Sequence, residues 1–189
     1  TSMGTMYLDF LDDGKIDDGT EATKDYSFDT TAQRTNKDRY WFRMKANQTL
    51  AADFKAKLDL DMVSDEDYLL EFKDGYTGYN AVKEYFNQEF GRDLDEYDDT
   101  TRENSLTIDK TWDHYNLTAK AVWYDDVVAR RHDTEDYTLQ TLPSLEFDAA
   151  KHELGTSGLY YTLDSEFRSF YRQDTTATKV NGQRLDIYP

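Results

Sequence analysis

The chain has 189 residues, a formal net charge of -17 and a mean hydropathy of -0.91. So acidic a chain would be repelled by the phosphates of nucleic acid, and no run of 18 apolar residues is present that would predict a transmembrane helix. Cysteine is absent, which excludes a disulfide framework, and the length is typical of one domain. Aromatic residues make up 15% of the chain, which is high for an ordinary acidic globular protein.

The first predicted strand covers residues 3–12. Gly4, Met6, Leu8 and Phe10 alternate with polar residues, so the amino-terminal residues are interpreted as the start of a strand rather than a cloning remnant. A polar connection, 13–37, follows.

The second and third strands form a long hairpin between Arg39 and Met62. Side chains of a strand alternate between its two faces, and here one face is apolar and the other charged. Each run has about 10 residues, the length of a strand that crosses a bilayer at a tilt, whereas strands of soluble proteins have about 5–6. A turn at 48–50 would place Lys45 opposite Asp53.

The connection 63–102 is predicted to be partly helical. Ser64 and Asp67 resemble a capping box. A second helix is expected over residues 81–90, between Asn80 as N-cap and Gly91 as C-terminal glycine. Its apolar stripe is expected either to pack against the strands or to cap or gate a pore, and the sequence does not distinguish these alternatives.

Five further strands are expected near 103–113, 117–128, 137–149, 154–172 and 183–189, with a short turn at 150–153 before the fourth of them. The long connections, 13–37, 63–102, 129–136 and 173–182, would all lie at one end of an up-and-down sheet, and the short turns at the other. Outer-membrane barrels sort their loops in this way. Pro143 falls within the sixth strand, where it predicts either a bulge or a weakened seam between strands.

Catalytic and cofactor motifs are missing from the sequence. His114, His132 and His152 fall in predicted connections without metal-ligand spacing, and no nucleophile motif or phosphate-binding glycine loop is present. We therefore expect no enzyme activity, no catalytic residue, no cofactor and no dedicated metal site. Weak binding of Mg²⁺ or Ca²⁺ is predicted for one acidic cluster, because hard cations prefer oxygen ligands. The cluster comprises Asp93, Asp95, Glu96, Asp98 and Asp99.

Several segments resemble an interior stretch of the LptD family, the lipopolysaccharide-assembly or organic solvent tolerance proteins. They are YLDFL, DRYWFRMKANQ, KLDLDMVSDEDYLLEF, WYDDVVARRHDTEDYTLQTLPSLEFD, YYTLDSEF and RLDIYP. Their order and spacing span nearly the whole chain, and together they are more specific than any single motif.

The resemblance implies that residues 1–189 are a segment of a larger antiparallel transmembrane β-barrel in the outer membrane of a Gram-negative bacterium. No signal peptide is visible, so we expect either that it was removed or that the chain is an internal segment, and the resemblance favours the segment. The fold class is thus all-β, with about eight up-and-down strands and long extracellular loops at 13–37 and 63–102. By resemblance, the whole protein inserts lipopolysaccharide into the outer leaflet. Its partners would be an LptE-type lipoprotein plug and periplasmic bridge proteins that deliver the lipopolysaccharide.

The two faces of the strands would then have different surroundings. The residues expected to face membrane lipid are Tyr40, Phe42, Met44, Phe54, Leu58, Leu60, Leu163 and Phe167. The residues expected to face the lumen are Arg43, Lys45, Asp53, Lys55, Lys57, Asp59, Asp164, Glu166 and Arg168. Two other classes stay open: a segment of a diffusion porin, and a soluble periplasmic or surface β-sandwich that binds glycans.

Overall fold

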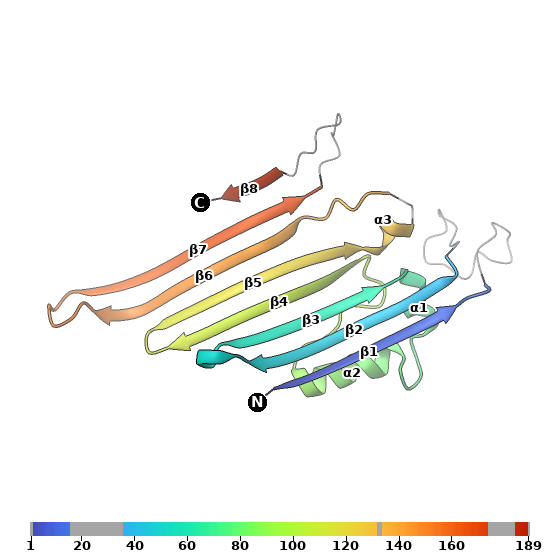
Figure 1. The fold of residues 1–189 in the computed structure, drawn as a ribbon, viewed down its shortest axis with the longest axis horizontal. Helices are drawn as coiled ribbons and strands as arrows, with labels where there is room; N and C mark the ends of the chain where they lie inside the picture. The colour runs from blue at the N-terminus through green and yellow to red at the C-terminus, as the bar shows by residue number, and fades with distance from the viewer. Residues whose placement is uncertain (1, 16–35, 132–133, 174–183, 189) are drawn as a thin grey trace.

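The computed structural model describes residues 2–15, 36–131, 134–173 and 184–188. They form one sheet of eight antiparallel strands in which each strand pairs with its neighbours in sequence (Figure 1). The strands are β1 Met3–Asp12, β2 Asp38–Thr49, β3 Lys55–Val63, β4 Thr101–Trp112, β5 Tyr115–Asp126, β6 Gln140–Glu153, β7 Tyr160–Arg172 and β8 Arg184–Tyr188. The all-β, up-and-down prediction is confirmed for a sheet that is open, with β1 and β8 at its edges.

Alternating burial along β2 gives the sheet two different faces. Arg39, Trp41, Arg43 and Lys45 are buried, whereas the residues between them are half-buried. One face of the sheet is covered in this region, by the chain between β3 and β4, and the other is not.

The β2–β3 turn differs from its prediction. Strand β2 extends to Thr49, and a 3-10 turn, η2 (Ala51–Asp53), follows with positive φ at Ala52 and Asp53. The longer turn changes the register, so that Lys45 pairs with Asp59. The predicted pairing with Asp53 is therefore wrong, and Asp53 lies exposed in the turn instead of on a strand face.

Helices α1 (Glu66–Glu71) and α2 (Tyr79–Phe90) confirm that the β3–β4 connection is partly helical, but each begins at a different cap from the one predicted. Helix α1 is capped by Asp65, whose carboxylate accepts from the Tyr68 backbone N–H, and not by Ser64. Helix α2 begins after Gly78, where a Cβ atom would lie 2.5 Å from the carbonyl oxygen of Asp74, so only glycine fits.

The end of α2 is as predicted, since Gly91 adopts the left-handed conformation with φ of 63°. A short third helix, α3 (Val127–Arg131), was not predicted. The Asp126 carboxylate accepts from the backbone N–H groups of Val128 and Ala129, which is an N-cap arrangement.

The long and short connections lie at opposite ends of the sheet, as predicted (Figure 1). The β1–β2, β3–β4, β5–β6 and β7–β8 connections share one end, which we call the loop end, and the three short turns share the other, the turn end. Most of connection 13–37 and all of 174–183 lie outside the described residues.

Strand β6 contains a bulge at Pro143. The register shifts between Thr141 and Ser144 against both β5 and β7, and pairing resumes beyond it with both neighbours. Beyond the last β5–β6 pair, the Gln140 side chain donates to the Tyr124 carbonyl (2.9 Å) and accepts from the Tyr124 N–H (2.6 Å). The predicted bulge is thus present, and a side-chain amide replaces part of the backbone ladder.

Candidate functional site: the two faces of the sheet

The apolar face is continuous across β1 to β7. Register partners connect Leu8 to Phe42 and then to Met62, and further along the sheet connect Leu145 to Phe167. Every residue that was predicted to face lipid lies on this face, including Phe54, whose ring lies 4.9 Å from the Lys110 Nζ. Exposed fractions of 62%, 64% and 67% for Met6, Leu8 and Phe10 mean that the protein itself leaves this surface uncovered.

The polar face lies on the other side of the same strands. One row of register partners contains Lys57, Thr107, Lys120, Ser144 and Arg168. The predicted lumen-facing residues, with the exception of Asp53, share this face. They are Arg43, Lys45, Lys55, Lys57, Asp59, Asp164, Glu166 and Arg168.

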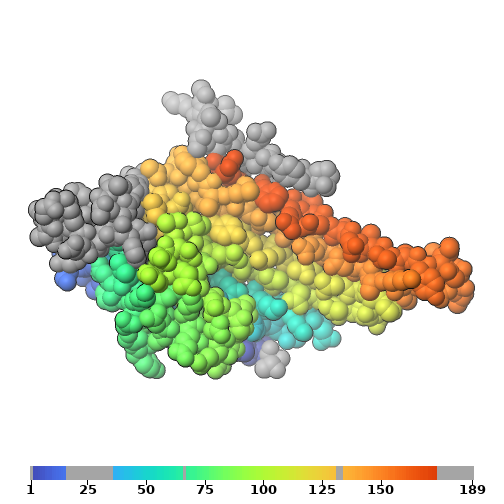
Figure 2. Space-filling view, turned by 180° about the vertical axis from the view of Figure 1, so that it is seen from behind, coloured from blue at the N-terminus to red at the C-terminus, as the bar shows by residue number. Residues whose placement is uncertain are grey.

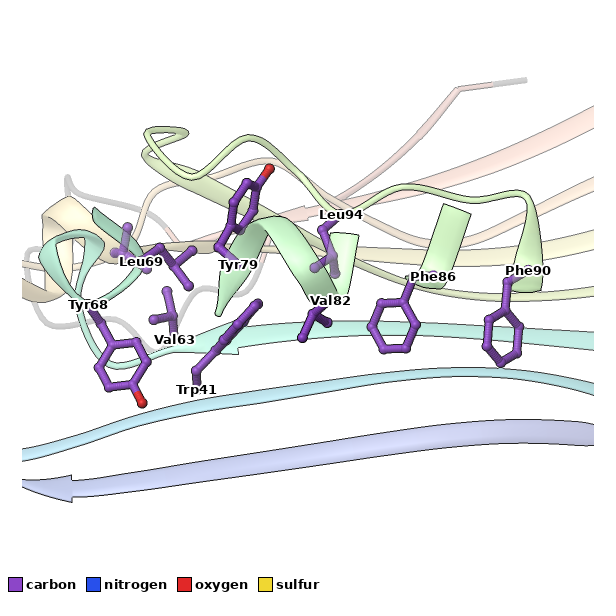
Figure 3. Packing of buried hydrophobic residues seen from close by; sticks show 10 residues of the cluster. Trp41, Val63, Tyr68, Leu69, Tyr79, Val82, Phe86, Phe90 and Leu94 are labelled. Atoms are coloured by element: carbon purple, nitrogen blue, oxygen red, sulfur yellow. The ribbon is translucent and has the colours of Figure 1, made fainter. Parts of the chain in front are cut away.

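The segment 64–100 folds back over the polar face of β1 to β4, where it lies in front of the strands in Figure 2. A stripe of α2 supplies Val82, Phe86 and Phe90 to a buried cluster against Trp41 of β2 (Figure 3). The remaining buried members are Val63, Tyr68, Leu69, Tyr79, Leu94 and Val127. The predicted packing of the helical stripe against the strands is therefore present, and this segment is called the inner loop below.

Arg39 fixes the start of the inner loop. Its guanidinium is fully buried and lies 2.8 Å from carboxylate oxygens of Asp13, Asp65 and Glu71. Buried charges are tolerated when they are paired and hydrogen-bonded, and these three partners come from the end of β1 and from the two ends of α1. The arginine thus ties the end of β1, the N-cap of α1 and the end of α1 to β2.

Arg43, four residues further along β2, also holds the inner loop against the strands. Its guanidinium pairs with Asp9 of β1 at 2.5 Å and donates to the backbone carbonyl of Thr77 at 3.1 Å. The Trp41 ring lies below it, with 3.9 Å between the guanidinium carbon and the ring centroid. This arginine therefore connects the two strands to the chain just before α2.

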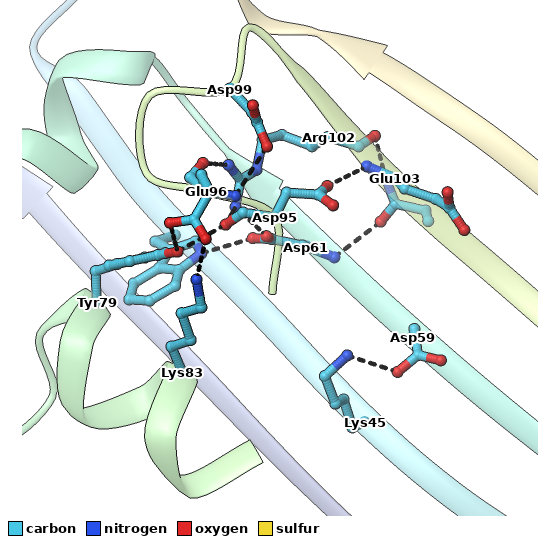
Figure 4. Close-up of polar contacts among 12 residues, drawn as sticks. Lys45, Asp59, Asp61, Tyr79, Lys83, Asp95, Glu96, Asp99, Arg102 and Glu103 are labelled. Carbon is cyan, nitrogen blue, oxygen red and sulfur yellow. Dashed lines mark hydrogen bonds and ion pairs between the residues drawn. The ribbon is translucent and has the colours of Figure 1, made fainter. Parts of the chain in front are cut away.

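A third buried arginine, Arg102, holds the end of the inner loop where β3 and β4 separate (Figure 4). The β3–β4 ladder ends at Asp59 and Ser105. Beyond that point Arg102 pairs with the Asp61 carboxylate and donates to the carbonyl oxygen of Asp95 at 3.1 Å. The same Asp61 carboxylate accepts from the Trp41 indole at 2.8 Å, so side chains replace the missing ladder.

Burial and one exposed ion pair shift the pKa values of three side chains in the inner loop. Burial raises the pKa of Tyr79 to about 12, and its hydroxyl donates to the carbonyl oxygen of Asp95 at 2.9 Å. A hydrogen bond from Lys83 holds the pKa of Glu96 below its ordinary value. Burial raises the pKa of the Asp95 carboxyl, whose oxygen accepts from the Glu103 backbone N–H at 2.6 Å.

A polar cavity of about 330 Å³ lies between the inner loop and the polar face of β2 to β5. Lys45 and Arg92 both contact the Asp59 carboxylate there, at 2.7 Å and 2.9 Å, and Lys120 lies 3.6 Å from Glu103. Donors and acceptors of both charges are therefore presented together. Such a lining suits a hydroxyl-rich or charged ligand and not an apolar one.

Carboxylates of the acidic cluster are already engaged within the protein. Asp93 accepts from the Asn87 side chain, Glu96 from Lys83, and Asp99 from the Glu96 backbone N–H. In the described part of the chain, no three carboxylates or histidines gather in a group that could hold a metal ion. Weak divalent binding stays a prediction without support from this arrangement.

Two of the histidines meet at the turn end. His114 and His152 have ring centroids 4.3 Å apart, and His152 also contacts Tyr161. His132 lies outside the described residues. His114 lies in the β4–β5 turn as predicted, but His152 does not lie in a connection, because β6 continues to Glu153. The pairing of β5 with β6 brings the two rings together, and the sequence alone does not show it.

The buried arginine network was missed by sequence reasoning. Arg39 and Arg102 sit at predicted strand ends, and nothing in the local pattern distinguishes them from exposed charges. The signal that was available was Trp41 on an otherwise charged face, since a large apolar ring there requires a covering element. The aromatic stripe of α2 is that element.

Comparison with known proteins identifies the family. A family model described as LptD, LPS transport system D, matches residues 37–189, which is more than half of the chain. No curated protein matched the chain. Among the described residues, no helix has the length and apolar character needed to cross a membrane. The match covers seven of the eight strands and the whole inner loop, and the chain therefore belongs to the LptD family of lipopolysaccharide transport proteins.

Proposed function

We propose that this chain forms part of the wall of an outer-membrane β-barrel through which lipopolysaccharide is moved to the outer leaflet. The observation that carries the proposal is the separation of the two faces: an exposed apolar face across β1 to β7, and a polar face behind it. A soluble protein rarely leaves so large an apolar surface uncovered. Membrane lipid would cover it at no energetic cost.

The strand stagger supports a barrel. One row of register partners joins Lys55, at the start of β3, to Asp109, Glu146 and finally Glu166, in the middle of β7. Strand ends therefore shift steadily along the sheet (Figure 1). Closing a barrel requires such a shift, because its strands tilt by about 35–45° from the axis.

The polar face would line the lumen and offer a path for the sugar and phosphate groups of lipopolysaccharide. The mixed-charge cavity beside Lys45, Arg92 and Lys120 suits such groups, because both donors and acceptors are available within one wall. The inner loop would narrow the lumen. The three buried strand arginines that hold this loop favour a fixed constriction over an open diffusion channel, so a porin is the weaker alternative. In the assembled protein, the lipoprotein plug and the periplasmic bridge expected from the family would act on the same path.

Crosslinking from two neighbouring residues tests the proposal. Thr107 lies on the polar face and Ile108 on the apolar face of β4. A photoreactive amino acid at Thr107 of the intact protein is expected to crosslink lipopolysaccharide during transport, while the same probe at Ile108 crosslinks membrane phospholipid. Lipopolysaccharide crosslinks that are equal at both positions, or absent from both, would contradict the proposal.

A further inference from the structure

Lys110 is a cation on the apolar face. Its register partner on β5 is Leu117, and Ile108 and Trp112 flank it on β4. The Nζ atom lies 4.9 Å from the Phe54 ring centroid and 5.5 Å from that of Trp112. The ammonium group is thus surrounded by aromatic and aliphatic side chains.

No ion pair neutralises this lysine within the described residues. The adjacent Asp109 points to the opposite face, where it lies 3.4 Å from Lys57. Glu146 and Glu166 occupy the same opposite row further along the sheet. In a chain with a net charge of -17, the surface around Lys110 is therefore a patch from which strand carboxylates are excluded.

Aromatic side chains continue from Lys110 along the turn end of the apolar face. Trp112, Tyr115 and Phe147 pack together with ring centroids 5.8–6.3 Å apart. The hydroxyls of Tyr115 and Tyr161 are hydrogen-bonded at 2.6 Å. Tryptophan and tyrosine prefer the boundary between acyl chains and headgroups, because the ring is apolar and its polar group stays hydrated.

We propose that Lys110 and the rings of Phe54 and Trp112 form a binding site for the phosphate of an anionic phospholipid headgroup. The rings contact the upper acyl chains and glycerol region, and the ammonium group pairs with the phosphate. Charge complementarity favours an anionic lipid, because no protein carboxylate satisfies the lysine. This inference rests on the proposed position of the apolar face in the membrane.

The test places a photoreactive amino acid at Leu117, the register partner of Lys110, in the intact protein. The protein is reconstituted into vesicles of phosphatidylcholine with one-fifth phosphatidylglycerol, and the crosslinked lipids are identified by mass spectrometry. We expect phosphatidylglycerol to be enriched about fivefold over its share of the bilayer, as one basic residue at an anionic surface would produce. Lys110→Gln should abolish the enrichment, and Lys110→Arg should retain it.

Lys55→Gln is the matched control. Lys55 pairs in register with Asp109, next to Lys110, but lies on the polar face and is exposed. The enrichment should survive this change, so its loss in Lys55→Gln would assign the effect to overall charge and overturn the inference. Lipid crosslinks in bilayer proportion in the parent protein would also overturn it. An absence of any lipid crosslink at Leu117 would instead contradict the proposed membrane position itself.

Discussion

The polar face is built differently in the two halves of the sheet. Along β2 its cations are buried: Arg39 is fully covered by the protein and binds three carboxylates. Along β7, Arg168 of the same face has a half-exposed side chain and lies 3.8 Å from Glu146. Alternation in the sequence sets which face a residue occupies, but the inner loop decides whether a charge on that face is buried or solvated.

The comparison predicts very different costs for removing an arginine from the two halves. Arg39→Ala removes the cation that Asp13, Asp65 and Glu71 share. We therefore expect the free energy of unfolding of the docked loop to fall by about 3–5 kcal/mol. Arg168→Ala should cost about 0–1 kcal/mol, because its pairs are exposed to solvent. Urea titrations of protease cleavage within residues 64–100, in detergent micelles, measure the difference. Equal costs would show that the inner loop does not bury Arg39.

Apolar packing of the inner loop provides a second test. The Phe86 side chain is fully buried and contacts Tyr7 and Phe90, so Phe86→Ala should destabilise the docked loop by about 3 kcal/mol. Tyr76→Ala, at a side chain 97% exposed, is the matched control and should change little. The measurement is the rate at which protease cleaves the inner loop. Similar rates for both variants would mean that the stripe of α2 does not hold the loop in place.

Asp95 should make the stability of the docked inner loop fall as pH rises, whereas a carboxylate in an ordinary ion pair makes stability rise with pH. Its pKa is raised by burial, so its contribution to stability is present below the pKa of the unfolded chain and is lost as pH rises through the folded pKa. Asp95→Asn keeps an acceptor for the Glu103 N–H without the buried charge. Urea titrations should show that the variant loop is more stable than the parent at pH 7, with the difference shrinking as the pH falls through the folded pKa of Asp95. A variant that is less stable at pH 7 would contradict the assignment.

Substitution of Pro143 should have the smallest effect on stability among these variants. Because β6 forms a bulge there and pairs on both sides of it, Pro143→Thr adds a backbone donor where the ladder has no place for one. We expect no gain in melting temperature in detergent. A clear gain would favour the alternative of a weakened seam between β5 and β6.

Much of the sheet could be predicted from the sequence because strand alternation is a local property. The first strand was predicted at its observed bounds, and the apolar residues from Tyr40 to Phe167 share one face as expected. The β2–β3 register was wrong because a 3-10 turn with two positive φ angles carries no proline or glycine to indicate it.

The candidate site was less predictable, because it depends on contacts between distant segments. Arg102 and Asp61 meet only where the β3–β4 ladder ends, and no local pattern reports that separation. The N-cap of α2 is Gly78 and not the predicted Asn80. The preceding turn brings the Asp74 carbonyl too close to residue 78 for any side chain there. The stripe of α2 was visible in the sequence, but the anchoring of the loop by three buried arginines was not.

The most direct test of the two faces is a spin-label scan of residues 105–109 in β4 of the membrane-reconstituted protein. Labels on the apolar face at Leu106 and Ile108 should collide with oxygen, which concentrates in the bilayer. Labels on the polar face at Ser105, Thr107 and Asp109 should collide more with a water-soluble nickel chelate. An alternating profile would support a membrane-spanning strand with one lipid-facing side. Higher collision with the nickel chelate at all five positions would contradict it and indicate a sheet exposed to water on both faces.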